Sequence, residues 1–420
     1  MMRYSIYTLG CKVNQYETQA MEHMLRERGL EPAADGAADV IIVNTCAVTA
    51  ESGRKSRQAI RRLMQQNPGA LVAVCGCYSQ VEPEAVRALG ADVVFGTAER
   101  EKFVEAIAGG GHAERIDDPF KRLVIEPLPA GSVAGRTRAL MRIQDGCDNF
   151  CSYCIIPYSR GRVRSLPLET AAEQAAQLAA QGFREIVVTG IEIASYGKDL
   201  PGRPGLAEAV CAIAGAAPGA RIHLGSLEPT VVTEAFCETL ASAGNVCRHF
   251  HLSLQSGCDD TLARMRRKYD TARFYEACGL LRRYFPGCAL TADLIAGFPG
   301  ETEADFDATL AFLEKCAFSH VHCFPYSPRP GTKAADMPQQ HSHALKEARV
   351  RRAMALVERM QREYLASCVG QSLPVLFENA HEGHADNYCL VAVEAPQERG
   401  CVKTVQITGV EEEKLVGFVV

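Results

Sequence analysis

The chain has 420 residues, too many for one ordinary domain of ~150 residues, and 47% of them are hydrophobic, which is ample for buried cores. A formal net charge of −5 argues against a protein whose entire surface binds nucleic acid, although it is compatible with a local basic patch. The N-terminus lacks the apolar run of a signal peptide, and no stretch approaches the ~18 unbroken apolar residues of a membrane span. We therefore expect a cytoplasmic protein without membrane association, whose 18 cysteines bind metals or pack as small buried side chains rather than form disulfides.

Residues 1–98 alternate short β-rich runs with helical patterns, and strands separated by helices form a parallel sheet with right-handed crossovers. This pattern predicts an N-terminal parallel α/β domain. The strands are expected at residues 3–9, 39–44, 70–74 and 92–95, and the helices at residues 16–28 and 53–66.

Three cysteines, Cys11, Cys46 and Cys77, follow the ends of the first three predicted strands. Because the carboxyl ends of parallel strands meet at one edge of a sheet, these thiols are expected to converge as a three-thiolate metal site. The alternative is that they are buried core thiols, the usual fate of a lone cysteine. Cys75 lies two residues before Cys77 on the same strand face; we favour Cys77 because it follows a glycine after the strand, but the sequence does not decide between them.

Residues 99–135 contain Gly109–Gly111, scattered prolines and the small-residue run Ala130–Gly135. This composition is typical of connecting segments, and we predict a linker here.

The segment from Asp145 to Pro157 places Cys147, Cys151 and Cys154 in a C-x3-C-x2-C loop. A closed zinc site needs four Cys or His ligands, and no histidine lies near this loop in the sequence. A [4Fe–4S] cluster held by three cysteines leaves one iron open to bind a reactive ligand. Zinc and unliganded thiols are the alternatives to the cluster. The spacing and Tyr153 before the last cysteine resemble the signature loop of radical S-adenosylmethionine (SAM) enzymes, which implies that the open iron binds SAM.

Three motifs in the N-terminal part of the chain show a further resemblance. They are TLGCKVNQYET from Thr8 to Thr18, VNTCAVT from Val43 to Thr49 and GCYSQ from Gly76 to Gln80. They are similar to the N-terminal domain of the methylthiotransferases, and the resemblance spans essentially the whole chain. It implies that Cys11, Cys46 and Cys77 hold a second, auxiliary [4Fe–4S] cluster, which carries the sulfur or methylsulfide to be inserted.

Six strand-like runs separated by helices follow in residues 136–365, and they fit a partial TIM-like (β/α)6 barrel whose chemistry gathers at the carboxyl ends of its strands. The resemblance implies the same radical SAM barrel. The predicted strands are residues 139–144, 185–189, 221–225, 249–254, 289–295 and 320–324.

Several residues at these strand ends are candidates for binding SAM. Gly190 and Glu192 follow the second strand and resemble the segment that meets the methionyl amino group of SAM. Glu228 and Gln255 end the third and fourth strands. Individually these are weak signals, because a glutamate at a strand end can simply cap the next helix.

Cations gather at two places in this domain, in YSRGRVR from Tyr158 to Arg164 and in RMRRKY from Arg264 to Tyr269. Runs of this kind are usually solvated surface. Because both are expected on the active-site face, we predict that they contact the phosphates of a nucleic acid. The candidate substrate-binding residues are Arg160, Arg162, Arg164, Arg266, Arg267 and Lys268.

Residues 366–420 show short alternating runs broken by turns, with strands predicted at residues 372–377, 388–393, 402–408 and 413–419. A β domain of this size belongs to the small OB-like barrels. Its position resembles the RNA-binding TRAM-like domain of methylthiotransferases that act on tRNA. However, the segment has three cations against eight acids, a net charge of −5, so its composition does not indicate RNA binding.

The chemistry implied by the resemblance begins with an electron from the cluster at Cys147, Cys151 and Cys154, which cleaves SAM to methionine and a 5′-deoxyadenosyl radical. A second SAM methylates sulfur on the auxiliary cluster, and the methylthio group replaces a hydrogen of the substrate. The short motifs at Gly10–Asn14, Cys154–Arg162 and Ser226–Pro229 are similar to the corresponding motifs of one branch of this family. That branch modifies N6-threonylcarbamoyladenosine at position 37 of tRNA.

Other functions are open alternatives. Within the family they are modification of isopentenyladenosine in tRNA or of an aspartate in a ribosomal protein. From a different class they are a non-catalytic iron–sulfur electron carrier and an RNA-binding protein, although neither has a use for two open clusters. For the tRNA threonylcarbamoyladenosine function, the expected partners are the anticodon stem-loop of tRNA and a reducing donor such as flavodoxin or ferredoxin. We expect the protein to be a monomer.

Overall fold

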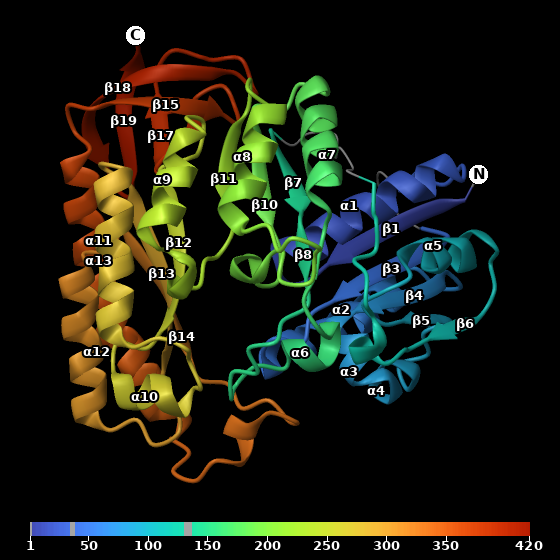
Figure 1. Cartoon of the computed structure of the whole chain (residues 1–420). Coiled ribbons are helices and arrows are strands. Elements are labelled where there is room, and N and C mark those ends of the chain that lie inside the picture. Colours follow the sequence, from blue (N-terminus) through green and yellow to red (C-terminus); the bar gives the residue numbers. More distant parts are fainter. Residues whose placement is uncertain (1, 34–37, 130–136) are drawn as a thin grey trace. The chain divides into compact units, whose positions relative to one another are not determined.

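The computed structural model of the chain describes residues 2–33, 38–129 and 137–420 (Figure 1). They form two compact units. The first combines residues 1–134 with 142–166 and 327–335, and the second combines residues 135–141 with 167–326 and 336–420. The three-cysteine loop after Asp145 therefore packs with the N-terminal domain, which differs from the boundary predicted at residue 136.

The first unit contains a parallel sheet in the order β2-β1-β3-β4-β5-β6. Its central strand β3 is buried along its whole length: it begins with four apolar residues, Val40–Val43, and ends with the buried polar residues Asn44 and Thr45. The strands are β1 (Arg3–Thr8), β2 (Glu31–Pro32), β3 (Val40–Thr45), β4 (Leu71–Gly76), β5 (Val93–Phe95) and β6 (Ala113–Arg115), and a small antiparallel pair is formed by β8 (Gln144–Asp145) and β9 (Arg164–Ser165).

Helices connect the strands of this sheet. The helices of the first unit are α1 (Lys12–Glu27), α2 (Ala50–Gln66), α3 (Cys77–Val81), α4 (Pro83–Arg87), α5 (Arg100–Ala108) and α6 (Ile156–Arg160).

The linker predicted at residues 99–135 is wrong in its first part, because α5 and β6 belong to the sheet domain. Phe103, Val104 and Ile107 of α5 are fully buried, and their spacing forms one helical face. The glycines at 109–111 end this helix rather than begin a flexible segment. The small-residue run 130–135 lies outside the described residues.

The second unit contains the six predicted barrel strands as two three-stranded sheets, β11-β10-β7 and β12-β13-β14. Isolated parallel bridges, Ile222 with Val246 and Leu227 with Leu252, continue the pairing between them. The partial barrel is thus confirmed. Its strands are β7 (Arg138–Arg142), β10 (Glu185–Thr189), β11 (Arg221–Leu224), β12 (His249–Gln255), β13 (Ala289–Ala296) and β14 (His320–Pro325).

Helices pack against these sheets: α13 contacts β14 and β13, α12 packs against α13, and α11 packs against α12 (Figure 1). They are α7 (Leu168–Ala180), α8 (Leu206–Ala216), α9 (Glu234–Ser242), α10 (Asp259–Arg264), α11 (Thr271–Tyr284), α12 (Glu303–Cys316) and α13 (His343–Ser367). Short 3-10 helices occur at Pro119–Lys121, Ile193–Ser195, Pro229–Val231 and Lys333–Asp336.

The C-terminal residues form a closed β-barrel, in the order β15-β16-β17-β19-β18, as the OB-like class predicts. Strand β16 was not predicted, because the residues between the strands expected at 372–377 and 388–393 were assigned to a turn. A Cβ at Gly383 would lie 2.2 Å from the carbonyl oxygen of Leu376, so this glycine permits close strand pairing. The strands are β15 (Ser372–Phe377), β16 (Glu382–Ala385), β17 (Leu390–Val393), β18 (Val402–Glu411) and β19 (Lys414–Val419).

This small barrel is attached at the amino ends of the radical SAM strands, opposite to the carboxyl ends that carry the candidate site residues. Arg221, the first residue of β11, donates hydrogen bonds to the carbonyl oxygens of Pro374 (3.0 Å) and His384 (2.9 Å). Arg248 pairs with Asp386 at 2.7 Å. Among the described helices, none combines the length and apolar composition needed to cross a membrane.

Glu185, His223 and Cys247 lie buried at the same end, and they bring three possible metal-ligand atoms within 4.8 Å of one another. However, Glu185 accepts an ion pair from Arg221 at 2.7 Å and a contact from His223 Nδ1 at 3.0 Å. The carboxylate is thus already neutralised by a guanidinium group, which indicates a structural ion pair rather than a cation site.

Replacing Arg221 should loosen the C-terminal barrel. The Arg221→Ala variant loses both hydrogen bonds to the barrel and leaves the buried Glu185 carboxylate short of a partner, a change that costs about 3–5 kcal/mol. We expect faster amide hydrogen exchange in β15 and β16. The exposed Arg184→Ala variant is the control, and equal exchange in the two variants would contradict this anchoring role.

Candidate active site

The three N-terminal cysteines lie at the carboxyl ends of neighbouring strands. Cys11 caps α1 just after β1, Cys46 follows β3, and Cys77 is the first residue of α3 after β4. The backbone approaches closely here: a Cβ at Gly10 would lie 3.0 Å from Cβ and 3.2 Å from Sγ of Cys46. Parallel strand order therefore brings the three thiols to one edge of the sheet.

Gly76 decides how the chain reaches Cys77. Its φ is +105°, and a Cβ there would lie 2.5 Å from the carbonyl oxygen of Thr45, so only glycine fits. Cys75 remains within β4 and is fully buried, and burial raises the pKa of its thiol to about 12. This placement supports Cys77 as the third ligand, with Cys75 as a core residue.

Asn14 organises the site, and sequence reasoning missed it. Its side-chain amide donates to the carbonyl oxygens of Leu9 (2.8 Å) and Thr45 (2.9 Å), which tie the Cys11 and Cys46 turns together. Its Oδ1 accepts hydrogen bonds from Arg160 at 2.9 Å and from the Cys11 thiol at 3.7 Å. The i, i+3 spacing of Cys11, Asn14 and Glu17 on one face of α1 was the signal that could have identified it.

The loop of Cys147, Cys151 and Cys154 is partly exposed and is held by its backbone. Cys147 N–H donates to the Gly161 carbonyl (3.0 Å), and Cys154 N–H donates to the Cys151 carbonyl (3.0 Å). Gly146 has a φ of +73°, and a Cβ there would lie 1.8 Å from the Arg162 carbonyl oxygen. The loop therefore closes against the chain after α6. None of the chain's 18 cysteines forms a disulfide in the described residues.

The Gly146→Ala substitution should disrupt this loop, because the added methyl group collides with fixed backbone. Gly182 also has a positive φ of +91°, but no atom lies within 4 Å of an added Cβ. We expect Gly182→Ala to cost about 1–2 kcal/mol from backbone strain alone, and Gly146→Ala to cost clearly more. Thermal unfolding of the metal-free proteins measures both. Equal losses would show that the predicted collision does not occur.

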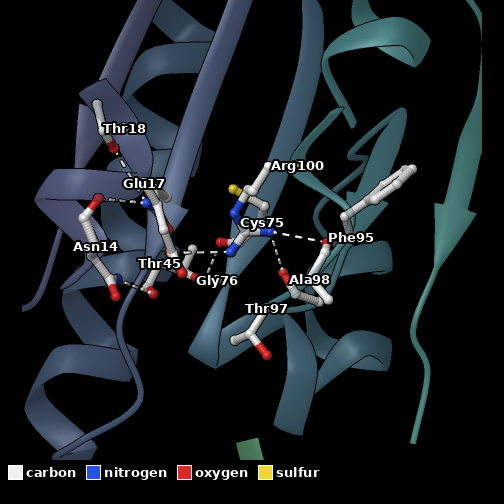
Figure 2. Close-up of polar contacts among 12 residues, drawn as sticks. Asn14, Glu17, Thr18, Thr45, Cys75, Gly76, Phe95, Thr97, Ala98 and Arg100 are labelled. Carbon is white, nitrogen blue, oxygen red and sulfur yellow. Dashed lines mark hydrogen bonds and ion pairs between the residues drawn. The ribbon is translucent and has the colours of Figure 1, made fainter. Parts of the chain in front are cut away.

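A buried charge network lies beside these cysteines. The Glu17 carboxylate pairs with Arg160 (2.7 Å), Arg100 (3.2 Å) and Arg142 (3.4 Å), all of them buried. Figure 2 shows Arg100 next to Glu17 and Cys75. Burial alone would raise the pKa of Glu17, but the guanidinium groups of Arg160 and Arg100 outweigh it and lower the pKa to about 2. Glu17 is thus an anion at all ordinary pH values.

Asp145 is the second anion of this network. It pairs with Arg160 (3.2 Å), Arg164 (3.2 Å) and Arg142 (3.4 Å). Burial opposes ionisation of the carboxyl group, but these guanidinium groups hold its pKa well below the usual range. Arg160 therefore connects α1 of the sheet domain to the start of the three-cysteine loop.

The donor chemistry of both cysteine sets fits iron–sulfur clusters, which are held by thiolates. At the N-terminal set, burial raises the pKa of Cys11 to about 11, while the charge of Arg160 acts in the opposite direction. Arg160 Nε is buried without a hydrogen-bond partner among the described residues. A buried cation with an unused donor is suited to an anionic group bound by these thiols.

Two carboxylates and an arginine meet at the carboxyl ends of the strands in the second unit. Glu228 lies 3.7 Å from Arg267 Nη2 and accepts a hydrogen bond from Thr230 (3.3 Å). Burial, together with the negative charge of Glu228, raises the pKa of Glu192 to about 7. Gln255 ends β12 with a φ of +69°, a conformation uncommon for a residue with a side chain. Such strained positions concentrate at binding sites.

We expect Glu192 to be protonated below pH of about 7. Because its folded-state pKa is raised above the unfolded value of ~4.3, this group costs stability progressively as the pH rises from that value through 7. Titration of 13C-labelled glutamate carboxyls, assigned with Glu192→Gln, measures the midpoint. In Glu228→Gln the midpoint should fall, and an unchanged midpoint would show that the two groups are not coupled.

The structure divides the predicted cationic residues into two groups. Arg160 and Arg164 are buried and paired with Glu17 or Asp145, so the structure does not support contact between them and a nucleic acid. Arg267 is directed to Glu228 and to the hydroxyl group of Tyr269 (3.0 Å). The exposed cations are Arg162, Arg266 and Lys268, while Tyr153 and Gly190 are half-buried.

Comparison with known proteins agrees with this geometry. The Radical SAM superfamily matches residues 141–313, and Uncharacterized protein family UPF0004 matches residues 3–96. The "Threonylcarbamoyladenosine tRNA methylthiotransferase MtaB" of Bacillus subtilis is 38% identical over 95% of this chain and 92% of its own. The "tRNA-2-methylthio-N(6)-dimethylallyladenosine synthase" of Moorella thermoacetica is 36% identical over 91% of this chain and 88% of its own.

Among solved structures, the radical S-adenosylmethionine methyltransferase TsrM of Kitasatospora setae has a similar fold. Its TM-score is 0.56 with 17% identity, and the match covers 80% of this chain and 77% of that one. At this identity the likeness concerns the fold alone.

The barrel, the C-x3-C-x2-C loop and the superfamily match define a radical SAM enzyme. The near-complete coverage of its relatives identifies the family: the chain belongs to the radical SAM methylthiotransferases, and it is similar to their MtaB-named members. It is therefore a transferase whose cofactors are two [4Fe–4S] clusters and SAM.

Proposed function

We propose that this chain inserts a methylthio group at C2 of N6-threonylcarbamoyladenosine at position 37 of tRNA, giving 2-methylthio-N6-threonylcarbamoyladenosine. The observation that carries the proposal is the presence of two separate three-cysteine sets in one compact unit. A simple radical SAM reaction requires one such set, whereas sulfur insertion requires a source of sulfur as well. The 38% identity to the Bacillus subtilis relative supports threonylcarbamoyladenosine as the substrate.

The second candidate substrate is isopentenyladenosine. The Moorella thermoacetica relative, named for dimethylallyladenosine, is 36% identical over most of its length, so overall similarity separates the two only slightly. The words Gly10–Asn14 and Ser226–Pro229 favour the threonylcarbamoyl branch.

Each cysteine set is assigned to one cluster. Cys147, Cys151 and Cys154 hold the radical SAM cluster, and Cys11, Cys46 and Cys77 hold the auxiliary cluster. When bound, these groups supply the electron that cleaves SAM and the sulfur that is transferred. The chain's own residues keep the thiols in place: Asn14 joins the Cys11 and Cys46 turns, and Gly146 closes the second loop.

The strand-end residues of the second unit bind SAM. Glu192 and Glu228 offer carboxylates to the amino group and ribose hydroxyls of SAM, and Arg267 offers a cation to its carboxylate. Gly190 and Gln255 complete the cofactor contacts of this unit, and the predicted cofactor contact of Tyr153 belongs to the loop of Cys147, Cys151 and Cys154. Arg162, Arg266 and Lys268 are exposed and are suited to tRNA phosphates, which dominate affinity for such substrates.

The partners follow from this reaction. The substrate is the anticodon stem-loop of tRNA, and the electron comes from a reducing donor such as a flavodoxin or ferredoxin. A cytoplasmic location and a monomeric state stay predictions. With a net charge of −5, the C-terminal barrel offers RNA hydrogen bonds rather than a basic surface.

Single cysteine variants separate the two sites in an anaerobic reaction with SAM, dithionite and tRNA that carries threonylcarbamoyladenosine. Cys147→Ala should abolish both 5′-deoxyadenosine and the methylthio nucleoside. Cys11→Ala and Cys77→Ala should abolish the methylthio nucleoside but still release 5′-deoxyadenosine. Cys75→Ala is the matched control and should keep both products, which mass spectrometry quantifies.

Two results would contradict the proposal. If tRNA with isopentenyladenosine reacts and tRNA with threonylcarbamoyladenosine does not, the substrate is wrong. If Cys75→Ala loses the methylthio product and Cys77→Ala retains it, the ligand assignment is wrong.

A further inference from the structure

The buried network next to the N-terminal cysteines contains more cations than anions. Four arginines face two carboxylates, and each of the six residues is at most 4% exposed. The half-buried Glu126, whose carboxyl contacts the backbone N–H of Arg100, compensates at most one further charge. The members are Arg100, Arg142, Arg160, Arg164, Glu17 and Asp145. A positive surplus therefore remains inside the protein.

A buried surplus of one sign is costly, because water no longer screens it and no partner neutralises it. A [4Fe–4S] core held by three thiolates carries a net negative charge in both of its common oxidation states. Binding such a group next to the arginines would remove the surplus. The positive surplus of the network therefore favours an anionic group bound at the adjacent cysteine set.

Arg160 is linked to this cysteine set through Asn14. Its Nη2 donates to Asn14 Oδ1 at 2.9 Å, and the same oxygen accepts from the Cys11 thiol at 3.7 Å. Arg160 and the Cys11 thiol therefore share one acceptor, and the amide of the same Asn14 donates to the carbonyl oxygen of Thr45 at 2.9 Å, which precedes Cys46.

Two anions fix the guanidinium group in place. Arg160 Nη1 donates to Glu17 Oε1 at 2.7 Å and to Asp145 at 3.2 Å, and Nη2 donates to Glu17 Oε2 at 3.2 Å, so both terminal nitrogens are anchored. Its buried Nε has no hydrogen-bond partner among the described residues. Arg160 is thus held rigidly by residues from α1 and β8, with one N–H still unused.

We propose that Arg160 is a positioning residue for the auxiliary cluster: held by Glu17 and Asp145, it supplies the fixed positive charge that stabilises the reduced cluster at Cys11, Cys46 and Cys77. This inference rests on the proposed function, which places a cluster there. A fixed cation next to a cluster favours its more negative, reduced form and so raises its reduction potential. The same arginine ends α6, six residues after Cys154. The reduction potential of the auxiliary cluster therefore depends on a residue of the segment that holds the radical SAM cluster.

The test uses the Cys147→Ala/Cys151→Ala/Cys154→Ala variant of the full chain, in which the auxiliary cluster can be observed alone. Its reduction is followed by electron paramagnetic resonance at controlled potentials. Arg160→Gln should lower the midpoint potential, and Arg160→Lys, which keeps the charge, should restore most of it. The exposed Arg61→Gln is the control and should leave the potential unchanged.

Glu17→Gln provides a second test if the Arg160 variants fail to fold. It is nearly isosteric and removes one of the two anions, so the midpoint potential should rise, opposite to the effect of Arg160→Gln. A role limited to packing would not give shifts of opposite sign.

Three outcomes would overturn the inference. Arg160→Gln could match Arg61→Gln, or Arg160→Gln and Arg160→Lys could shift the potential equally, or Glu17→Gln could fail to raise it. The complete absence of a reducible cluster in the background variant is different, because it would also overturn the proposed auxiliary site.

Discussion

The ion pairs between Glu17 and three arginines are the interaction on which the first unit depends. They join residues more than 80 positions apart in the sequence: Glu17 lies on α1, Arg100 begins α5, and Arg142 and Arg160 flank the three-cysteine loop. Removing one partner from a buried pair costs about 3–5 kcal/mol, because an uncompensated charge stays behind. The same contacts therefore decide the stability of the sheet domain and the position of the loop.

The parallel sheet supplies the second constraint. Its strand order places β1, β3 and β4 side by side, so the segments that follow them must meet at one edge. Gly10 and Gly76 allow the backbone to approach closely there, and the side-chain amide of Asn14 donates hydrogen bonds to the carbonyl oxygens of Leu9 and Thr45. A site of three thiols thus follows from topology and two glycines, and the neighbouring arginines give it an electrostatic preference for an anionic ligand.

Much of this arrangement could be predicted from the sequence. The central strands of the N-terminal sheet and of the partial barrel have strong apolar patterns. The spacing of Cys147, Cys151 and Cys154 leaves few alternatives to an iron–sulfur cluster. The cysteines at strand ends follow from the rule for parallel sheets. Strands β6 and β16 were missed because each is short and adjoins or contains glycine, which was interpreted as a break.

The burial of Arg160 could not be predicted from its local sequence, because its partners Glu17 and Asn14 lie over 140 residues away. The run Arg160, Arg162 and Arg164 looks like a uniform basic patch. In the structure its first and third members are buried and the middle one is exposed, because Arg160 ends α6, Gly161 turns the chain with a φ of +77°, and Arg164 lies in β9. In a cationic run near a cluster, buried and exposed side chains therefore have to be distinguished before any of them is predicted to bind RNA.

The most direct measurement of this account is the Mössbauer spectrum of the anaerobically reconstituted full chain and of two triple-alanine variants, one for each cysteine set. The account predicts two [4Fe–4S] clusters in the wild-type chain and one in each variant, with different spectra for the two. A single cluster in the wild-type chain, lost in either triple variant, would show that the six cysteines do not form two independent sites and would contradict the account.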